Sequence, residues 1–318
     1  MDVSIVIVNW NGGKMLTECL ASIEKAEQGL ALQVIVVDNA SRDGSREMAE
    51  NQFPHFQVVN SGANIGFGKA NNLARRLVRS DLVLFLNPDT VLLKNSLKPM
   101  VDFIRAHPEV GAVGCKMRYP TGEVHEQGLQ YVPSPWTEFL NLLFASTETR
   151  RWFAKWLPTL NPHQSGYVVK LYGGCLLCRR DLLDKVGWFD ERYFMYAEDV
   201  DLCLAIMKQK AKLYYLSTAE VIHIAGGISK NAPSGFAVLM KAESIAKFMK
   251  KHHGGLGMVL YRVVILVSAS TRISLIAVGR GLAVLLGKGP ESEFTRRLFK
   301  HWNLILWALG LRKPVIAS

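Results

Sequence analysis

The sequence predicts an α/β fold, a mostly parallel sheet with helices on both faces. Over the first ninety residues, short apolar runs rich in β-branched residues alternate with stretches of helical spacing. Strands buried on both faces read as continuous apolar runs, because helices cover both sides of a parallel sheet. The length of 318 residues and the 49% apolar content suit a globular chain of one large or two ordinary domains.

The elements of this first part follow in a regular order. Val3–Val8 predicts a strand, and Lys14–Glu27 has apolar residues at helical spacing. Val34–Val37 predicts a second strand, which stops at Asp38. The next four elements are a helix over Ser45–Asn51, a strand over Phe56–Val59, a helix over Lys69–Val78 and a strand over Leu82–Leu86.

The pattern changes twice further along the chain. Residues 111–218 are mixed and richer in aromatic residues, with a helix predicted over Trp136–Phe144 and a basic, aromatic stretch over Arg150–Trp156. Beyond residue 237 the chain reads as helical. Shorter strands are predicted over Val110–Cys115, Val168–Cys178 and Lys212–Leu216. We therefore expect parts at 1–110, 111–236 and 237–318.

The net charge of +11 belongs to the C-terminal part. From Lys241 onward there are 13 Lys and Arg against 3 Asp and Glu, whereas residues 1–240 are nearly neutral. A basic, apolar tail on a neutral body indicates an anionic membrane surface rather than nucleic acid. Arg262, Arg272 and Arg280 fall on one side of a helix, which predicts an interfacial helix that does not span the membrane. The alternative is a helical subdomain packed on the body or on a second subunit.

Polar residues follow the predicted strands and should meet at one sheet edge, where such sheets bind ligands. Asp38 could accept hydrogen bonds from the imide of a pyrimidine, or it could cap the next helix. Gly66-Phe67-Gly68 lacks the third glycine of a dinucleotide fingerprint, because Asn71 stands there. A glycine turn beside a phosphate, with Lys69 nearby, and a plain turn before a helix both remain open.

Three further motifs carry chemistry. Asp89 in Asn87-Pro88-Asp89 could bind Mg²⁺ or Mn²⁺, or the tripeptide could be a plain turn. Glu198 and Asp199 offer carboxylates for a general base, or stabilise the start of a helix. His223 lies in an apolar strand before two glycines, so it is a core residue or a ligand.

These motifs, in this order, resemble family 2 of the inverting nucleotide-sugar glycosyltransferases, which have the GT-A fold. Within the family the likeness is greatest to bacterial rhamnosyltransferases that build O-antigen and other surface polysaccharides. The resemblance covers residues 1 to about 230. It rests on Val3–Asn11, Val36–Ser45, Asn64–Asn71, Asn87–Thr90, Gly173-Gly174, Phe189–Glu191, Glu198–Leu202 and His223.

The resemblance implies a role for each matching residue. Asp199 would be the catalytic base, with Glu198 beside it to orient the acceptor or the base. Asp89 and His223 would hold the metal, Mg²⁺ or Mn²⁺. The nucleotide-sugar site would comprise Val8, Asn9, Trp10, Asp38, Gly66, Lys69, Asn87 and Asp89. Residues 1–110 would then bind the nucleotide, and 111–236 the acceptor.

The implied activity is transfer of a sugar, with rhamnose favoured, from a dTDP- or UDP-sugar to a polyprenyl-diphosphate-linked saccharide. The expected location is the cytoplasmic face of the bacterial inner membrane, held peripherally. Two departures from the family pattern are Asn87, in place of a first Asp, and Ala205, in place of an Arg. They leave open the alternative that the chain is a nucleotide-sugar-binding protein or a membrane scaffold protein with weak catalytic activity. A nucleotidyltransferase, a second alternative, would show a basic glycine-rich loop after the first strand, where only Lys14 stands.

Overall fold

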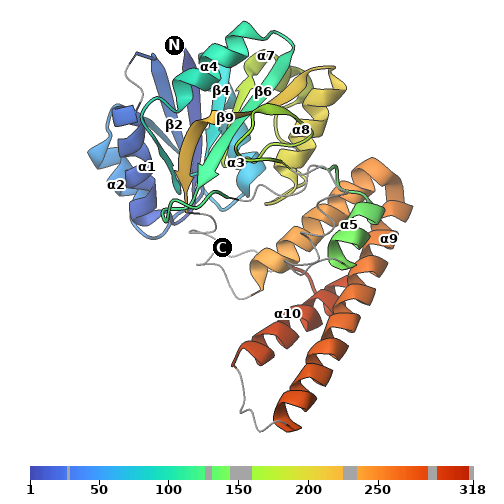
Figure 1. Cartoon of the computed structure of the whole chain (residues 1–318). Coiled ribbons are helices and arrows are strands. Elements are labelled where there is room, and N and C mark those ends of the chain that lie inside the picture. Colours follow the sequence, from blue (N-terminus) through green and yellow to red (C-terminus); the bar gives the residue numbers. More distant parts are fainter. Residues whose placement is uncertain (27–28, 126–130, 144–159, 225–234, 286–291, 315–318) are drawn as a thin grey trace. The chain divides into compact units, whose positions relative to one another are not determined.

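The computed structural model describes residues 1–26, 29–125, 131–143, 160–224, 235–285 and 292–314 (Figure 1). The chain divides into two compact units. One comprises Met1–Val132 and Leu157–Asn231, and the other comprises Pro133–Trp156 and Ala232–Ala317. The predicted basic, aromatic stretch Arg150–Trp156 lies outside the described residues.

The first unit is an α/β domain, as the sequence predicts. Its sheet has the strand order β3-β2-β1-β4-β8-β6-β9-β5, and β7 pairs with β9 off this path. The strands are β1 (Val3–Asn9), β2 (Leu32–Asp38), β3 (Gln57–Asn60), β4 (Leu82–Leu86), β5 (Thr90–Leu92), β6 (Val110–Arg118), β7 (Gly166–Val168), β8 (Cys175–Arg179) and β9 (Lys212–His223). The helices are α1 (Gly13–Ala26), α2 (Ser45–Gln52), α3 (Phe67–Leu73), the short η1 (Ala74–Arg76), α4 (Leu97–Ala106), α7 (Arg180–Val186) and α8 (Glu198–Lys208).

The sheet register brings the polar strand ends together. β1 pairs in parallel with both β2 and β4, and β2 pairs in parallel with β3. Asn9 stands opposite Asp38, and Asp38 stands opposite Asn60. The predicted common edge at the carboxyl ends of the first strands is therefore confirmed.

Helices cover both faces of this sheet with apolar side chains. One face packs against α1, α2 and α4, through residues such as Leu20 and Val101. The other packs against α3, α7 and α8, through residues such as Ala70 and Leu202. Because α3 and α8 share this second face, their first turns can contribute to one site.

Several predicted elements differ from the structure; β6 and β9, for example, run on to Arg118 and His223. The single strand over Val168–Cys178 is wrong, because β7 pairs with β9 whereas β8 lies between β4 and β6. An apolar run does not show that its hydrogen-bonding partner changes part-way. The helix predicted over Lys69–Val78 starts earlier, at Phe67, and tightens into η1 after Leu73.

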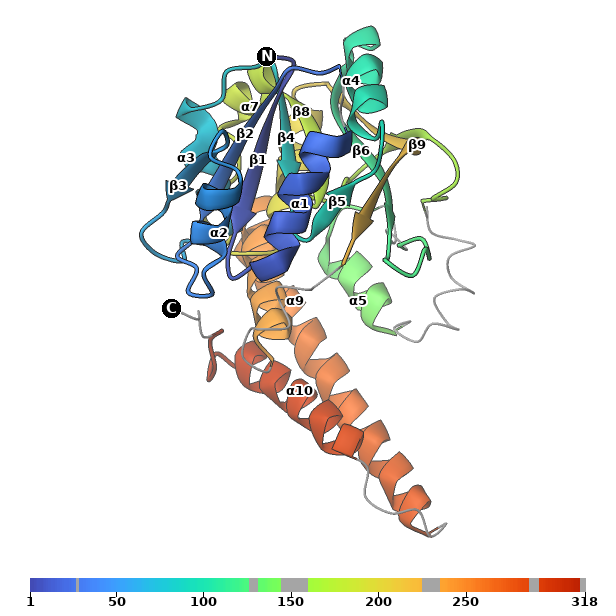
Figure 2. The same ribbon diagram turned by 90° about the vertical axis from the view of Figure 1, so that its left-hand side faces the viewer.

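The second unit is helical and contains α5 (Pro135–Leu143), α9 (Phe236–Leu285) and α10 (Ser292–Ala308). Gly254, with a φ of 73°, kinks α9, and α10 packs beside α9 (Figure 2). Arg262 lies over the ring of Trp307, with 5.0 Å between its Cζ and the ring centroid, and Arg280 lies over Phe294 at 6.0 Å. Two arginines of the predicted basic stripe thus contact α10.

Several large apolar side chains in α9 from Leu256 onward are exposed. They include Leu256, Val259, Val263, Val267, Leu275 and Val278. By length and composition alone, Phe236–Gly281 is also long and apolar enough to cross a membrane. The interfacial arrangement therefore stays a prediction.

Candidate active site

The ends of β1 and β2 carry a hydrogen-bonded network around Asn9 and Asp38. The Asn9 Nδ2 lies 2.9 Å from Asp38 Oδ1, 3.0 Å from Ser41 Oγ and 2.8 Å from Ser45 Oγ. The second oxygen of Asp38, Oδ2, accepts the backbone N–H of Ser41 at 3.1 Å. Asp38 is buried, at 1% exposed, so its carboxylate is fixed within the protein.

Asp38 does not cap the following helix. That helix, α2, begins at Ser45, with Gly44 at the N-cap position. The side chain that accepts the Ser45 N–H is Asp43, at 3.1 Å. The interpretation of Asp38 as a helix cap is therefore wrong, and its carboxylate instead holds the turn that leaves β2.

A second connection brings the start of α3 to the same edge. Asn39 Nδ2 donates to Asn64 Oδ1 at 2.9 Å, and Asn39 Oδ1 accepts the backbone N–H of Ile65 at 2.9 Å. Gly66 follows at once and precedes the first residue of α3. Of the other predicted nucleotide-site residues, Val8 is buried, Trp10 is half-buried and Lys69 is exposed.

Asp89, which follows β4, lies beside His223, the last residue of β9. Asp89 Oδ1 lies 3.2 Å from His223 Nε2, and both side chains are mostly buried. The Asn87 Nδ2 lies 3.4 Å from the same ring nitrogen. Pairing of β5 with β9 sets Thr90 opposite His223, which explains why residues so distant in sequence are neighbours.

The separation of this pair is that of an ion pair, and it also suits two adjacent ligands on one divalent cation. Ligands each about 2.1 Å from an octahedral ion lie about 3 Å apart, close to the separation of Asp89 Oδ1 and His223 Nε2. Among the described residues, no group of three His, Cys, Asp or Glu side chains could hold a metal ion. Water and phosphate oxygens would have to complete the coordination, as is usual for Mg²⁺.

Glu198 and Asp199 begin α8 after a strained turn. Tyr196 and Ala197 have φ values of 70° and 67°, in the left-handed region. Such a conformation in residues other than glycine is uncommon and clusters at functional sites. Asp199 Oδ1 accepts the N–H of Val200 at 2.8 Å, and its Oδ2 accepts the N–H of Gly173 at 3.2 Å.

Burial raises the pKa of both carboxyl groups. For Glu198, burial comes first and the charge of Asp199 second, and together they raise its pKa to about 8. For Asp199, burial raises the pKa, while hydrogen bonds from Val200 and Gly173 and the charge of Lys170 oppose the rise. The Oε2 of Glu198 is buried and has no hydrogen-bond partner within the described chain. A higher pKa makes a carboxylate a stronger base.

The dipeptide Gly173-Gly174 joins the Asp199 and His223 groups. A Cβ on Gly173 would lie 3.3 Å from the Cβ of Asp199, and a Cβ on Gly174 would lie 3.6 Å from His223 Nε2. The carbonyl of Gly174 also accepts the N–H of Asn87 at 3.0 Å. The side chains of Asp199 and His223 therefore each lie against one of two residues that are adjacent in the chain.

The comparisons with known proteins now identify the family. The model of glycosyl transferase family 2 matches residues 4–187, more than half of the chain. The chain belongs to glycosyl transferase family 2. An N-acetylglucosaminyl-diphospho-decaprenol L-rhamnosyltransferase of Mycobacterium tuberculosis is 30% identical, over 79% of this chain and 85% of that one. The rhamnosyltransferase WbbL of Escherichia coli is 26% identical, over 70% of this chain and 83% of that one.

Solved structures of glycosyltransferases share the fold. Mannosyltransferase PcManGT from Pyrobaculum calidifontis, in complex with GDP-Man and Mn²⁺, aligns with a TM-score of 0.57 at 17% identity, over 98% of this chain and 86% of that one. TarS 1–349 of Staphylococcus aureus, in complex with UDP-GlcNAc, aligns with a TM-score of 0.52 at 19% identity, over 97% and 81%. The predicted GT-A fold and rhamnosyltransferase-like membership of the family are confirmed.

Some contacts in this site had no signal in the sequence. The Lys170 charge near Asp199 comes from a residue that nothing in the local pattern marks as functional. The same holds for His125, whose ring lies 5.3 Å from that of His223. Such contacts link residues far apart along the chain, so only the folded structure brings them together.

Proposed function

We propose that this family 2 member is an inverting, metal-dependent glycosyltransferase that moves rhamnose from a dTDP- or UDP-sugar to a polyprenyl-diphosphate-linked saccharide. The observation that supports it most is that Asp199 lies against Gly173 while His223, paired with Asp89, lies against the adjacent Gly174. A catalytic base and a diphosphate-binding ion must lie on either side of one anomeric carbon. The relative from M. tuberculosis is itself named for transfer of L-rhamnose to a diphospho-decaprenol-linked sugar.

The nucleoside would bind at the ends of β1 and β2, against Val8, Asn9 and Trp10. Asp38 is held by Asn9 and the Ser41 N–H, so its carboxylate needs no reorganisation to accept a pyrimidine imide N–H. A purine is larger and has no imide, the N–H between two carbonyls that uracil and thymine present. Gly66 and Lys69 would lie near the nucleotide at the start of α3.

Asp199 would remove the proton from the acceptor hydroxyl as its oxygen attacks the anomeric carbon. A single displacement from the face opposite the leaving group inverts the configuration and needs no covalent enzyme intermediate. Glu198, with its raised pKa, would be neutral at pH 7 and able to donate a hydrogen bond to the acceptor or to Asp199. Mg²⁺ or Mn²⁺, held by Asp89 and His223 beside Asn87, would neutralise charge on the departing diphosphate.

The helical unit would hold the enzyme peripherally at the cytoplasmic face of the inner membrane, within reach of a lipid-linked acceptor. Support comes from the exposed apolar side chains of α9 and from the strongly basic composition beyond Lys241. Basic residues near anionic lipid contribute about 1 kcal/mol each. The five cysteines are buried and form no disulfide, which agrees with a reducing compartment.

The direct experiment is a donor panel. The purified chain is incubated with dTDP-rhamnose, UDP-galactose, UDP-N-acetylglucosamine and GDP-mannose, each with Mg²⁺ or Mn²⁺. Thermal shift reports binding, since a ligand at about 100 times its Kd stabilises by about 2.7 kcal/mol, and nucleoside diphosphate release reports turnover. We expect dTDP-rhamnose to be preferred.

Two results would contradict the proposal. Preferred turnover of GDP-mannose would refute the pyrimidine site at Asp38. Binding of a donor without metal-stimulated release of diphosphate, with or without acceptor, would instead favour a nucleotide-sugar-binding protein. The features that favour this alternative are Asn87, whose amide lies 3.4 Å from His223 Nε2, and Ala205.

A further inference from the structure

A short hairpin extends β6 beyond its last residue. The chain turns through Gly122, which has a φ of 86°, and Gly122 N–H donates to the carbonyl of Tyr119 at 2.9 Å. Tyr119 N–H donates to the carbonyl of Glu123 at 2.8 Å. His125 N–H donates to the carbonyl of Met117 at 2.9 Å, so the returning arm is held to β6.

The returning arm ends on His223. His125 Nε2 lies 3.0 Å from the backbone carbonyl oxygen of His223. A carbonyl oxygen can only accept, so His125 Nε2 carries the hydrogen and donates it. The His125 ring stacks on Tyr119 with 3.6 Å between centroids and lies 5.3 Å from the His223 ring at an angle of 40°.

His223 lacks the support that a metal-binding histidine normally has. The ring nitrogen that does not face the metal usually donates to a carboxylate or carbonyl, which fixes the ring. In His223 that nitrogen is Nδ1, which is buried and has no hydrogen-bond partner among the described residues. The orientation of the ring must therefore come from its backbone and its packing, and His125 acts on both.

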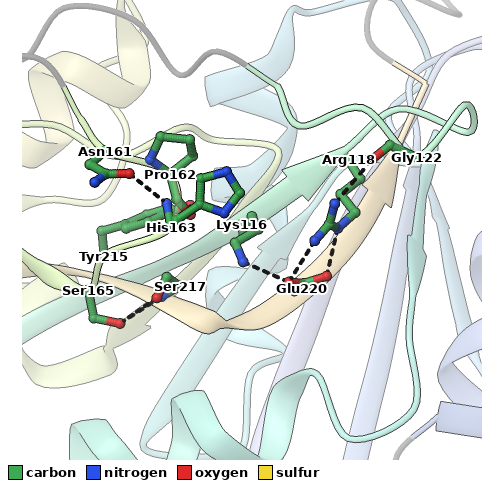
Figure 3. A network of polar contacts seen from close by, with 10 residues as sticks. All are labelled: Lys116, Arg118, Gly122, Asn161, Pro162, His163, Ser165, Tyr215, Ser217 and Glu220. Carbon is green, nitrogen blue, oxygen red and sulfur yellow. Dashed lines mark hydrogen bonds and ion pairs between the residues drawn. The ribbon is translucent and has the colours of Figure 1, made fainter.

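The other end of the hairpin is tied to the same strand by an ion-pair network (Figure 3). Arg118 contacts both carboxylate oxygens of Glu220, with Nε 2.7 Å from Oε2 and Nη2 3.1 Å from Oε1. Arg118 Nη1 also donates to the carbonyl of Gly122 at 3.1 Å, and Lys116 Nζ lies 2.7 Å from Glu220 Oε1. Arg118 thus fastens the turn to β9.

This anchorage lies where the sheet register is broken. Cys115 stands opposite Leu216, whereas Lys116 stands opposite Glu220, so three residues of β9 have no counterpart in β6. A bulge bends its strand and re-aims the residues that follow. Glu220 is the first residue paired after the bulge, and His223 ends the strand three residues later.

We propose that His125 is a positioning residue that holds His223 in its metal-binding orientation, through the Nε2–H bond to the His223 carbonyl and the ring contact. The hairpin of residues 118–125 is its support, anchored on Glu220 through Arg118. This inference rests on the proposed function, because it assumes that His223 is a metal ligand.

The test measures Mn²⁺ binding to the full chain by calorimetry in the presence of dTDP, whose phosphate oxygens would complete the coordination, with the heat of Mn²⁺ binding to free dTDP subtracted. His125→Phe keeps an aromatic ring against Tyr119 but removes the donor. His125→Gln restores an N–H near the position of Nε2. The matched control is His107→Phe, because His107 also stacks on a ring, Phe103 at 4.0 Å, and contacts a backbone carbonyl.

Loss of such a supporting contact typically weakens metal binding about 10- to 100-fold. We expect that loss for His125→Phe, affinity within a few-fold of wild type for His125→Gln, and no change for His107→Phe. Equal Mn²⁺ affinity in His125→Phe and wild type would overturn the inference, as would an equal loss in both His125 variants. His223→Ala distinguishes failure of this inference from failure of the proposed function. If it leaves Mn²⁺ binding unchanged, the proposed metal role of His223 itself is wrong.

Discussion

Gly66 is the position where one added methyl group should do most damage to the site. Its φ of 87° and ψ of 168° fall in a region that is essentially open to glycine alone, at a cost of about 1–3 kcal/mol for any other residue. A Cβ there would lie 2.4 Å from the carbonyl oxygen of Phe194 and 2.9 Å from its Cα. Both are backbone atoms, so no flexible side chain can move aside.

The displacement would pass directly to Glu198 and Asp199, the proposed catalytic carboxylates. The Phe194 carbonyl accepts the Phe67 N–H at 2.7 Å, and the strained residues Tyr196 and Ala197 follow before Glu198. Relieving the contact requires the backbone to shift by about 1 Å, and a misplacement of that size can cost about 100-fold in rate. Gly66→Ala should therefore lower kcat by about two orders of magnitude and destabilise the fold by a few kcal/mol.

Gly62→Ala is the matched control. Gly62 also has a positive φ, 78°, but nothing lies within 4 Å of its added Cβ. Gly62→Ala should be destabilised by backbone strain alone and should keep most of its activity. Turnover of the preferred donor and thermal melting, measured on both variants, decide the matter. Wild-type turnover in Gly66→Ala, or an equal loss of turnover in the two variants, would refute the reasoning.

Three further predictions concern the metal, the pH dependence of stability and the membrane. Calorimetry should show that Asp89→Ala abolishes the Mn²⁺-dependent binding of nucleoside diphosphate and that His223→Ala weakens it. Unchanged affinity in His223→Ala would mean that His223 is a core residue. Because the pKa of Glu198 is raised in the folded state to about 8, the folded form binds more protons than the unfolded form between about pH 4.5 and 8. The free energy of unfolding should therefore fall as the pH rises through this window. Measured by urea denaturation, this fall should be smaller in Glu198→Gln than in the wild type. An equal fall in both would contradict the raised pKa. The full chain should float with anionic liposomes at low salt, a chain ending at residue 236 should not, and carbonate should extract the full chain; retention after carbonate would indicate a spanning helix.

The sheet edge could be predicted because it depends on local pattern and on one geometric rule. Alternating apolar strands and helices imply a parallel sheet, and the carboxyl ends of neighbouring parallel strands meet at one edge. Asn9, Asp38 and Asn60 follow from that rule, and the register places them side by side. The sequence could not show that the Asp38 carboxylate is already engaged by Asn9 and Ser41, since that depends on how the turn after β2 folds back.

Contacts set by pairing over long sequence distances could not be predicted. The split of residues 166–179 between two parts of the sheet depends on which strand accepts each half. His125 lies 98 residues from His223, and no local pattern joins them. For the tail, helical periodicity placed Arg262 and Arg280 on one side of α9, but it could not reveal that the aromatic rings of α10 lie against them.

The central claim, that Asp199 is the base of an inverting transfer, is tested most directly with Asp199→Asn. This variant keeps the shape of the side chain and one acceptor oxygen for the backbone N–H groups of Gly173 and Val200, but removes its basicity. Loss of a general base typically lowers the rate by about 10² to 10⁴. The measurement is the transfer rate to acceptor at saturating donor, together with donor affinity by calorimetry. We predict a transfer rate reduced by that factor with donor affinity nearly unchanged, and transfer at the wild-type rate would contradict the assignment.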